Sequence, residues 1–567
     1  MTRCRPGSKW SEGEATMTSN VTHRLTTLPG SDRRLLLAMG GSALAALALG
    51  TVGGLVTALA RGGMIDILPE TAYRFLTVHG VGIFFYWLYL AQVALLLGFA
   101  AIDNEEGGIA FRPAAWTGFG LIAAGFVFSM AGAHMGTPLL YNGSPELAAD
   151  EPSTLLVFNL GYLLLGLGLM ATPAAAIATL LRSRRKEGRE TLSAVGFALL
   201  AWAGFLMVSG FAALHAFVPG TLWALGLGAF PEAQSTNWHI LFHNMHYLPL
   251  MATVLMWYVL VRVLTGVKSV FGERFSKIVF AFYLVFVPPT SLYHMFLEPD
   301  LPGAVRVTGS LLSLLVSVPT LTAFLIIVAS LEIHARARGA KGLFGWIGML
   351  PWRHPAMAAI GLAVVNMGFG LAFAFVLIQE KLAPLLSDTF FVPGYFHFFT
   401  VGTVSLTLLA AFAVMLPALA GRELAWPVLL RAMPWLATAG LLAFGGAGVA
   451  AGYLGVPRRV MDVTYGGEVP ALWQSLMAVV GIGGTVMAVA LFVFAAGVTA
   501  SMLPRRRSVE SSRLGVSWEG AAALRGTAAW TGPASILVIV AAMYLFTATG
   551  FELLQSLPFT AAGGAGH

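Results

Sequence analysis

The most constraining feature of this sequence is its series of long apolar stretches. An α-helix needs about 20 apolar residues to cross the hydrocarbon core of a bilayer, and about thirteen stretches of that kind can be drawn. Inside a bilayer each backbone polar group must be satisfied within its own segment or a closed barrel. We therefore expect an all-α, polytopic transmembrane helical bundle of about 13 spans, at roughly residues 35–60, 72–101, 114–138, 153–181, 192–218, 238–264, 276–297, 305–334, 356–380, 391–420, 429–454, 470–502 and 528–550.

The composition excludes a soluble protein and narrows the possible metal ligands. Hydrophobic residues make up 57% of the chain and charged residues 10%, whereas a soluble domain carries about a quarter charged residues. The single Cys4 rules out a disulfide framework or a cysteine cluster. Any metal must be held by His, carboxylate or Tyr. The net charge of +7 is explained by loop charges, so we expect a lipid bilayer and no nucleic acid as partner.

The loop charges also predict the orientation, because inner loops are enriched in Lys and Arg. With a cytoplasmic N-terminus, 27 of the 33 basic residues lie inside, and the other six are Arg61, Arg74, Arg306, Lys381, Arg458 and Arg459. The reverse orientation would put the 27 outside. We expect a polar cytoplasmic tail at 1–34, a twelve-span core at 35–502, and a basic cytoplasmic loop with one additional span at 503–567.

Four histidines fall near the outer ends of different expected spans: His79, His243, His294 and His397. Ionisable side chains inside a membrane are costly and usually functional. Spans that run in opposite directions place these four at one level, close to the outer face. A shared metal or haem layer accounts for that level better than scattered packing histidines do.

Local spacing adds detail at two of these positions. His243 and Tyr247 are separated by four residues, so they share one helix face, with Tyr247 on the cytoplasmic side. Tyr395 and His397 are two residues apart, which turns them about 200° from each other around the helix. One helix can therefore present a ligand to each of two flanking cofactors.

Over about residues 70–500 the sequence resembles subunit I of the B-type haem–copper oxygen reductases. The resemblance is carried by short motifs in a fixed order: Leu76-Thr77-Val78-His79-Gly80, His243 with Tyr247, Val318-Pro319 through Ala329-Ser330-Leu331-Glu332, Gly342-Leu343-Phe344-Gly345-Trp346, Leu350-Pro351-Trp352, Val392-Pro393-Gly394 and Val456-Pro457-Arg458-Arg459.

The resemblance implies a low-spin haem, expected to be b-type, with His79 and His397 as its two axial ligands. Two imidazoles leave no open iron position, so this haem relays electrons. Arg458 and Arg459 would pair with haem propionates, because a guanidinium matches a carboxylate bidentately.

The resemblance also implies an active-site copper bound by His243 and His294. Tyr247 would be the tyrosine that the family cross-links to a copper histidine. Electrons would enter from a subunit II-like protein or a cytochrome c on the outer face of a prokaryotic cytoplasmic membrane.

Two positions depart from the family pattern. Tyr293 stands where the family has a second copper histidine, and Tyr395 stands where it has the proximal ligand of the high-spin haem. Three hypotheses stay open. Tyr395 holds a second, high-spin haem as a tyrosinate, with His239 or His246 completing a copper site; or the dinuclear centre is lost and the chain is a one-haem electron-transfer or structural subunit; or a rebuilt site acts on nitric oxide.

We expect a cytochrome c oxidase-like terminal reductase with a non-standard active site. A proton path from the cytoplasm would run along Tyr247, Tyr258, Thr320 and Thr322. Ala323 and Ile326 replace hydroxyl residues expected in the B family, which favours a non-pumping reductase or a relay.

Overall fold

The computed structural model describes residues 21–103, 107–186, 192–232, 234–267, 269–286, 303–379 and 382–503. Within these ranges the regular structure is helical, apart from an isolated bridge between Thr389 and Pro457. The elements are α2 Gly30–Arg61, α3 Pro69–Gly80, η1 Val81–Trp87, α4 Leu88–Ile102, α5 Arg112–His134, η2 Glu146–Ala148, α6 Pro152–Lys186, α7 Ala194–Ala224, α8 Gln234–Thr265, α9 Gly272–Phe286, α10 Gly303–Ala337, α11 Gly345–Gly348, α12 Pro355–Leu377, α13 Ala383–Leu386, α14 Phe391–His397, η5 Phe398–Ser405, α15 Leu406–Ala420, α16 Pro427–Tyr453 and α17 Ala471–Ala500.

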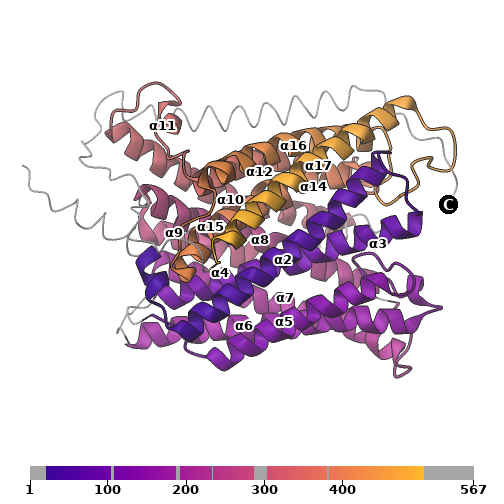
Figure 1. Cartoon of the computed structure of the whole chain (residues 1–567), viewed down its shortest axis with the longest axis horizontal. Helices are drawn as coiled ribbons and strands as arrows, with labels where there is room; N and C mark the ends of the chain where they lie inside the picture. Colours follow the sequence, from indigo (N-terminus) through magenta and orange to yellow (C-terminus); the bar gives the residue numbers. More distant parts are fainter. Residues whose placement is uncertain are drawn as a thin grey trace, which may run out of the picture.

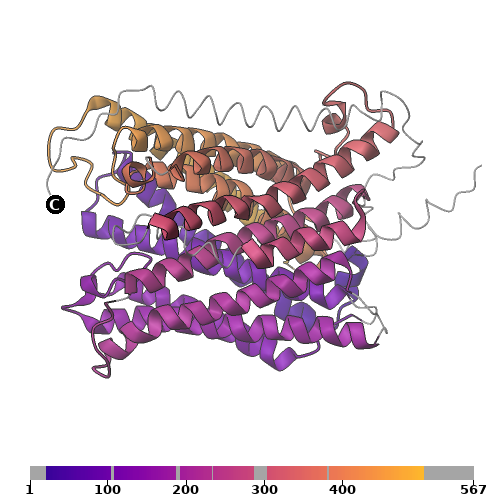
Figure 2. The same ribbon diagram turned by 180° about the vertical axis from the view of Figure 1, so that it is seen from behind.

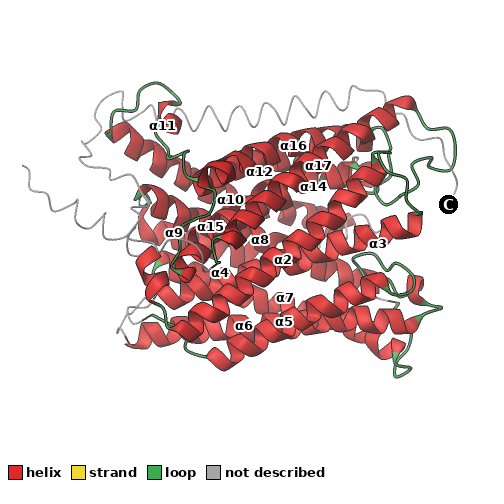
Figure 3. Ribbon diagram, in the orientation of Figure 1, coloured by secondary structure: helices red, strands yellow, loops and turns green. Residues whose placement is uncertain are grey.

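The long helices lie side by side along the longest axis of the molecule (Figures 1 and 2). The connections gather at the two ends of the bundle (Figure 3). The connection from α2 to α3 lies at the right end of Figure 1, which we call the outer end, and α11 lies at the opposite, inner end. The first long helix, α2, packs against the last described one, α17, so the two ends of the core meet. The expected all-α bundle is confirmed.

Ten helices of the described part are long and apolar enough to cross a membrane. The expected count of about thirteen stays a prediction, because three of the expected spans are not among these ten helices. The span at 528–550 and the second half of the one at 276–297 lie outside the described residues. In the third, expected at 238–264, the apolar helix is the shorter segment Pro249–Thr265.

Glycines allow neighbouring helices to approach closely. A Cβ added at Gly125 of α5 would lie 2.6 Å from the carbonyl oxygen of Gly161 in α6. Between helices in a bilayer the association comes from packing, which small residues bring to short range.

Two helical stretches differ from the rest in having their most apolar windows 100% buried in the protein: Pro69–Ile102 and Phe391–Ala420. The other eight windows are between 33% and 67% buried, as expected for helices that also contact lipid. The two central stretches carry His79 and His397. The fold therefore places both histidines inside the bundle.

Candidate cofactor site

The imidazole rings of His79 and His397 lie next to each other inside the bundle. Their ring centroids are 6.1 Å apart, and their planes differ by 10°. An imidazole nitrogen binds a metal such as zinc at about 2.0 Å and its ring centre lies roughly 1.1 Å further, so two rings on one metal are roughly 6 Å apart. The separation and the parallel planes match two rings on opposite sides of one metal.

Backbone hydrogen bonds select the nitrogen that each ring offers. Nδ1 of His79 lies 2.9 Å from the carbonyl oxygen of Gly50, and Nδ1 of His397 lies 2.7 Å from that of Pro393. A carbonyl oxygen only accepts, so each Nδ1 carries the proton and donates. The lone pair of the neutral ring is then on Nε2. Metal-binding histidines are commonly fixed in this way, through the ring nitrogen that does not bind the metal.

A run of glycines in α2 makes room for His79. A Cβ added at Gly54 would lie 2.6 Å from Nδ1 of His79 and 2.8 Å from its Cε1. At Gly53 it would lie 3.0 Å from the backbone nitrogen of His79. The sequence Gly50-Thr51-Val52-Gly53-Gly54 therefore lets α3 approach α2 at the turn that carries the histidine.

We expect Gly54→Ala to displace the His79 ring and lower haem affinity by roughly tenfold or more, as overpacking costs about 1–3 kcal/mol. The measurement is the haem content of the purified protein, by pyridine haemochrome, at limiting haem supply. Gly41→Ala is the matched control, because a Cβ at Gly41 on the same helix meets only the flexible end of Met502 at 3.9 Å. Equal haem content in both variants would contradict the prediction.

Both histidines precede a wide helical turn. The π-helical segment η1 begins at Val81, two residues after His79, and η5 begins at Phe398, directly after His397. The indole nitrogen of Trp87 in η1 donates to Oγ of Ser405 in η5, at 3.0 Å. Single π turns inside α-helices occur mostly at functional sites. Here they couple the two histidine-bearing helices to each other.

A cavity runs from the two rings toward the outer end of the bundle. His79, His397 and Phe444 line its middle, and Arg61 and Arg458 line its outer part. Phe444 contacts the His397 ring, with centroids 4.6 Å apart. Arg459 points elsewhere: it donates to the hydroxyl of Tyr141 at 2.8 Å. The expected pairing of Arg459 with a haem propionate stays a prediction.

Tyr395 does not line this cavity, although it is only two residues from His397. Its side chain is 9% exposed. It packs against the rings of Phe391, Phe396 and Phe399, with centroid distances of 6.1, 6.4 and 6.4 Å. The two side chains leave the helix on different sides, as their spacing predicts.

The expected copper residues are only partly within the described structure. His243 and Tyr247 lie on α8, but their side chains, like those of His239 and His246, are outside the description. Tyr293 and His294 lie outside the described residues altogether. Among the side chains that are described, no group of three or more His, Cys, Asp or Glu could hold a metal. The copper assignment therefore stays a prediction.

A buried tyrosine supports the turn of α8 that carries these histidines. Pro249 has no N–H, so it leaves the carbonyl of Met245 without its usual helical donor. The hydroxyl of Tyr89 in α4 donates to that carbonyl at 2.8 Å. Tyr89 thus supplies the missing donor directly beside His246 and Tyr247 in the chain.

We expect Tyr89→Phe to lower stability by about 1–3 kcal/mol, the cost of leaving a buried acceptor without a partner. Thermal unfolding in detergent measures it. Tyr86→Phe is the matched control, because its hydroxyl is equally buried but bonds to Ser129 and Gly161 in α5 and α6. We expect a change in metal content for Tyr89→Phe alone. Unchanged stability and metal content would show that Tyr89 does not support this turn.

The family model for cytochrome c and quinol oxidase polypeptide I matches residues 34–486 of the chain. The chain belongs to this family. Its members are membrane subunits of oxidoreductases that act in electron transport, and the ten apolar helices of the described part agree with a multi-pass membrane protein. The expected family membership is confirmed.

Two known proteins are similar to the chain. The chain is 30% identical to cytochrome c oxidase subunit 1 of Thermus thermophilus over 332 residues, which are 57% of this chain and 58% of that relative. The match thus spans less than two thirds of the relative. A haem–copper terminal oxidase dimer solved by cryo-electron microscopy matches with a TM-score of 0.76 and 20% identity, covering 95% of this chain and 96% of that one. At this identity the structural similarity supports the fold and nothing further.

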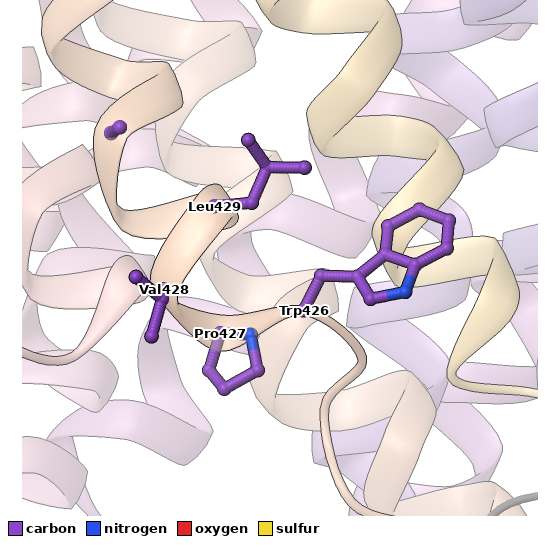
Figure 4. Close-up of a pocket in the computed structure, with 5 residues that line it drawn as sticks. Trp426, Pro427, Val428 and Leu429 are labelled. Carbon is purple, nitrogen blue, oxygen red and sulfur yellow. The ribbon is translucent and has the colours of Figure 1, made fainter.

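A second hollow, at the start of α16, has different chemistry. Trp426, Pro427, Val428 and Leu429 line it, with the indole of Trp426 directed away from Val428 (Figure 4). Its lining has no titratable side chain. Exposed apolar residues around a tryptophan at a helix end are typical of the membrane–water interface.

Sequence reasoning missed Gly54 and Arg61 at the cofactor cavity, and Tyr89, which supports the histidine-bearing turn of α8. The glycine spacing in α2 was a visible signal for the first. Arg61 was counted only as an outer-loop charge, although it ends an apolar span and is 5% exposed in the structure. Tyr89 carries no signal of its own, because its role depends on Pro249 in a helix far along the chain.

Proposed function

We propose that the chain is the haem-binding catalytic subunit I of a respiratory terminal oxidase, in a prokaryotic cytoplasmic membrane with its N-terminus inside. It takes electrons at the outer end from a subunit II-like protein or a cytochrome c. His79 and His397 would hold a low-spin haem that supplies electron transfer, and a modified dinuclear centre would supply the reduction of O2. Family membership and the positive-inside charge distribution support this proposal.

The observation that carries the proposal is the pair of parallel imidazoles 6.1 Å apart, each held through Nδ1 by a backbone carbonyl. The donor set fits a haem iron with both axial positions filled. Such a haem supplies one-electron transfer without an open position for a substrate. The apolar lining by Leu47, Ile83 and Leu491 suits the faces of a porphyrin.

The protein's own groups perform three tasks at this site. His79 and His397 fix the ligand planes through their backbone bonds, so little rearrangement accompanies electron transfer. Phe444 packs on the His397 ring and excludes water from it. Arg458, at the outer end of the cavity, offers a cation to a carboxylate group.

The dinuclear centre belongs on the other side of the α14–η5 helix, where Tyr395 lies. A tyrosinate can ligate haem iron. Tyr395 therefore supplies an oxygen donor at the position of the family's proximal ligand. Copper would use His243 and His294, with Tyr247 beside His243. This part of the proposal is supported by the family resemblance and by the side chains of Tyr395 and His397, which leave the helix on different sides.

A route for protons is supported by one pair of hydroxyls. Tyr283 of α9 and Thr320 of α10 lie 2.9 Å apart, both buried. Thr322 instead donates to the carbonyl of Val318 on its own helix. The hydroxyl of Tyr258 is buried close to Ser276. We propose that Tyr283 joins Thr320 in the route, and the parts of Tyr247, Tyr258 and Thr322 stay predictions.

Pyridine haemochrome assay with metal analysis tests the proposal on purified protein. We expect two haems and one copper per chain, and carbon monoxide binding by half of the reduced haem. A bis-histidine haem does not bind carbon monoxide, because it has no open position.

The alternatives give other outcomes. One haem, no copper and no carbon monoxide response would overturn the terminal-oxidase proposal in favour of a one-haem relay or structural subunit. Two haems with a different non-haem metal, and turnover of nitric oxide in place of O2, would favour a nitric oxide reductase-like enzyme.

A further inference from the structure

The wide turn η5 takes the usual donor away from one backbone carbonyl. In an α-helix the N–H of Leu406 would bond to the carbonyl of Gly402, four residues earlier. In this chain it bonds to the carbonyls of Val401 and Thr403 instead. Gly402 is buried inside the bundle. A buried acceptor without a partner costs free energy, so the carbonyl of Gly402 needs a donor from elsewhere.

A neighbouring helix supplies that donor. Nδ2 of Asn366 in α12 donates to the carbonyl oxygen of Gly402 at 3.3 Å and to Oγ1 of Thr438 in α16 at 3.1 Å. A carbonyl oxygen only accepts, so the amide must turn its nitrogen toward Gly402. Asn366 is 0% exposed. A polar side chain at membrane depth is costly, and here it lies opposite the carbonyl that lost its helical donor.

A small residue and a hydroxyl complete this arrangement. A Cβ added at Gly402 would lie 2.6 Å from Cβ of Asn366 and 2.6 Å from Cδ2 of Leu441, so only glycine lets α12 come this close. Oγ1 of Thr403 donates to the carbonyl of Phe398, five residues earlier, at 2.9 Å. One donor from α12 and one from the turn itself therefore hold the wide geometry.

The position of this turn matters because it begins directly after His397. The extra residue of a π turn cannot vanish from an unchanged sequence; it can only move along the helix, and the side chains between its old and new places then shift by one position. Nδ1 of His397 bonds to the carbonyl of Pro393 on the same helix, so the ring follows its own backbone. A turn that moved toward the outer end would carry the His397 ring away from His79.

We propose that Asn366 fixes the wide turn at Phe398–Ser405 through the carbonyl of Gly402, and thereby keeps the His397 ring parallel to that of His79. Asn366 does not line the cavity, so it is a positioning residue. The effect on the turn stands on the hydrogen bonds described above, whereas the effect on a haem ligand rests on the proposed function.

The experiment compares Asn366→Leu and Thr438→Val with the unmodified protein. Leu has nearly the size of Asn but no donor, so the carbonyl of Gly402 loses its partner. Thr438→Val is the matched control, because it removes the other acceptor of the same amide and leaves the bond to Gly402 in place. Each variant leaves one buried polar group unpaired, so we expect both to lower the thermal stability to a similar extent.

Two measurements separate positioning from stability. The first is the electron paramagnetic resonance of the oxidised low-spin haem, since the angle between the two imidazole planes determines the anisotropy of the signal. We expect a second low-spin species in Asn366→Leu, populated about tenfold above its level in the unmodified protein. The second is backbone amide exchange over residues 398–406, which needs no haem and should be roughly tenfold faster. In Thr438→Val both should stay within about twofold.

Gly402→Ala tests the same bond from its other side, because the added Cβ would push Asn366 away. It should reproduce both changes, and it decides the case if Asn366→Leu does not retain haem. An unchanged signal and unchanged exchange in these variants would overturn the inference. Equal changes in Thr438→Val would show that the amide only contributes to packing. Absence of a bis-imidazole signal from the unmodified protein would overturn the proposed function, and amide exchange would then decide on Asn366 and the turn by itself.

Discussion

Replacing His397 with Ala is expected to abolish the low-spin bis-imidazole spectrum completely. The ring supplies one of two ligands, and its partner 6.1 Å away cannot fill both axial positions. A five-coordinate haem with one open site should remain or be lost during purification. The measurement is the reduced-minus-oxidised absorption spectrum, together with carbon monoxide difference spectra, in which any retained haem should become reactive.

His134→Ala is a suitable control for this variant. Its Nδ1 lies 2.9 Å from the carbonyl of Met130 four residues earlier, the same local arrangement that His397 makes with Pro393. His134 does not line the cavity. A sharp low-spin spectrum that survives His397→Ala would refute the ligand assignment, whatever the control shows.

Replacing Tyr395 with Phe should remove carbon monoxide binding and O2 turnover, down to background, while the low-spin spectrum stays unchanged. Only the phenol oxygen can ligate iron, and Phe has none. The packing should survive, because the contacts of Tyr395 with Phe391, Phe396 and Phe399 are made by its ring. Carbon monoxide difference spectra and an oxygen electrode measure the two quantities.

Tyr395→His serves as the complementary variant. It restores the imidazole of the family pattern, so it should retain a carbon monoxide-reactive haem with a shifted spectrum. If Tyr395→Phe binds carbon monoxide and turns over O2 like the unmodified protein, Tyr395 is not a ligand. The high-spin haem would then need another donor.

The helical bundle and the closeness of His79 to His397 could be predicted from the sequence, whereas the role of the two histidines as haem ligands stays a prediction. Spans can be found from apolar length alone, because a bilayer leaves the backbone few options. The two histidines could be paired because motif order and depth both place them together. The opposite directions of Tyr395 and His397 followed from the helix period.

The rest depends on contacts that a linear pattern does not contain. The π segments after His79 and His397 have apolar sequences that also suit an ordinary α-helix. The bond from Tyr89 to Met245 joins residues 156 positions apart. Arg61 bonds to the backbone carbonyls of residues 457 and 458, whose positions are set by tertiary packing.

The wide turns after His79 and His397 also limit how this chain can vary. A π turn holds one more residue than an α turn, so removing a single residue from Val81–Trp87 or Phe398–Ser405 would regularise the helix. Hydropathy and span length would hardly change. The two flanking halves would keep nearly the same direction, because a π turn accommodates its extra residue locally, but side chains inside the segment would meet new neighbours. A deletion that leaves the hydropathy profile intact would thus disturb the contact of Trp87 with Ser405 that joins the two histidine-bearing stretches, and substitutions elsewhere in these segments should be tolerated better than changes of length.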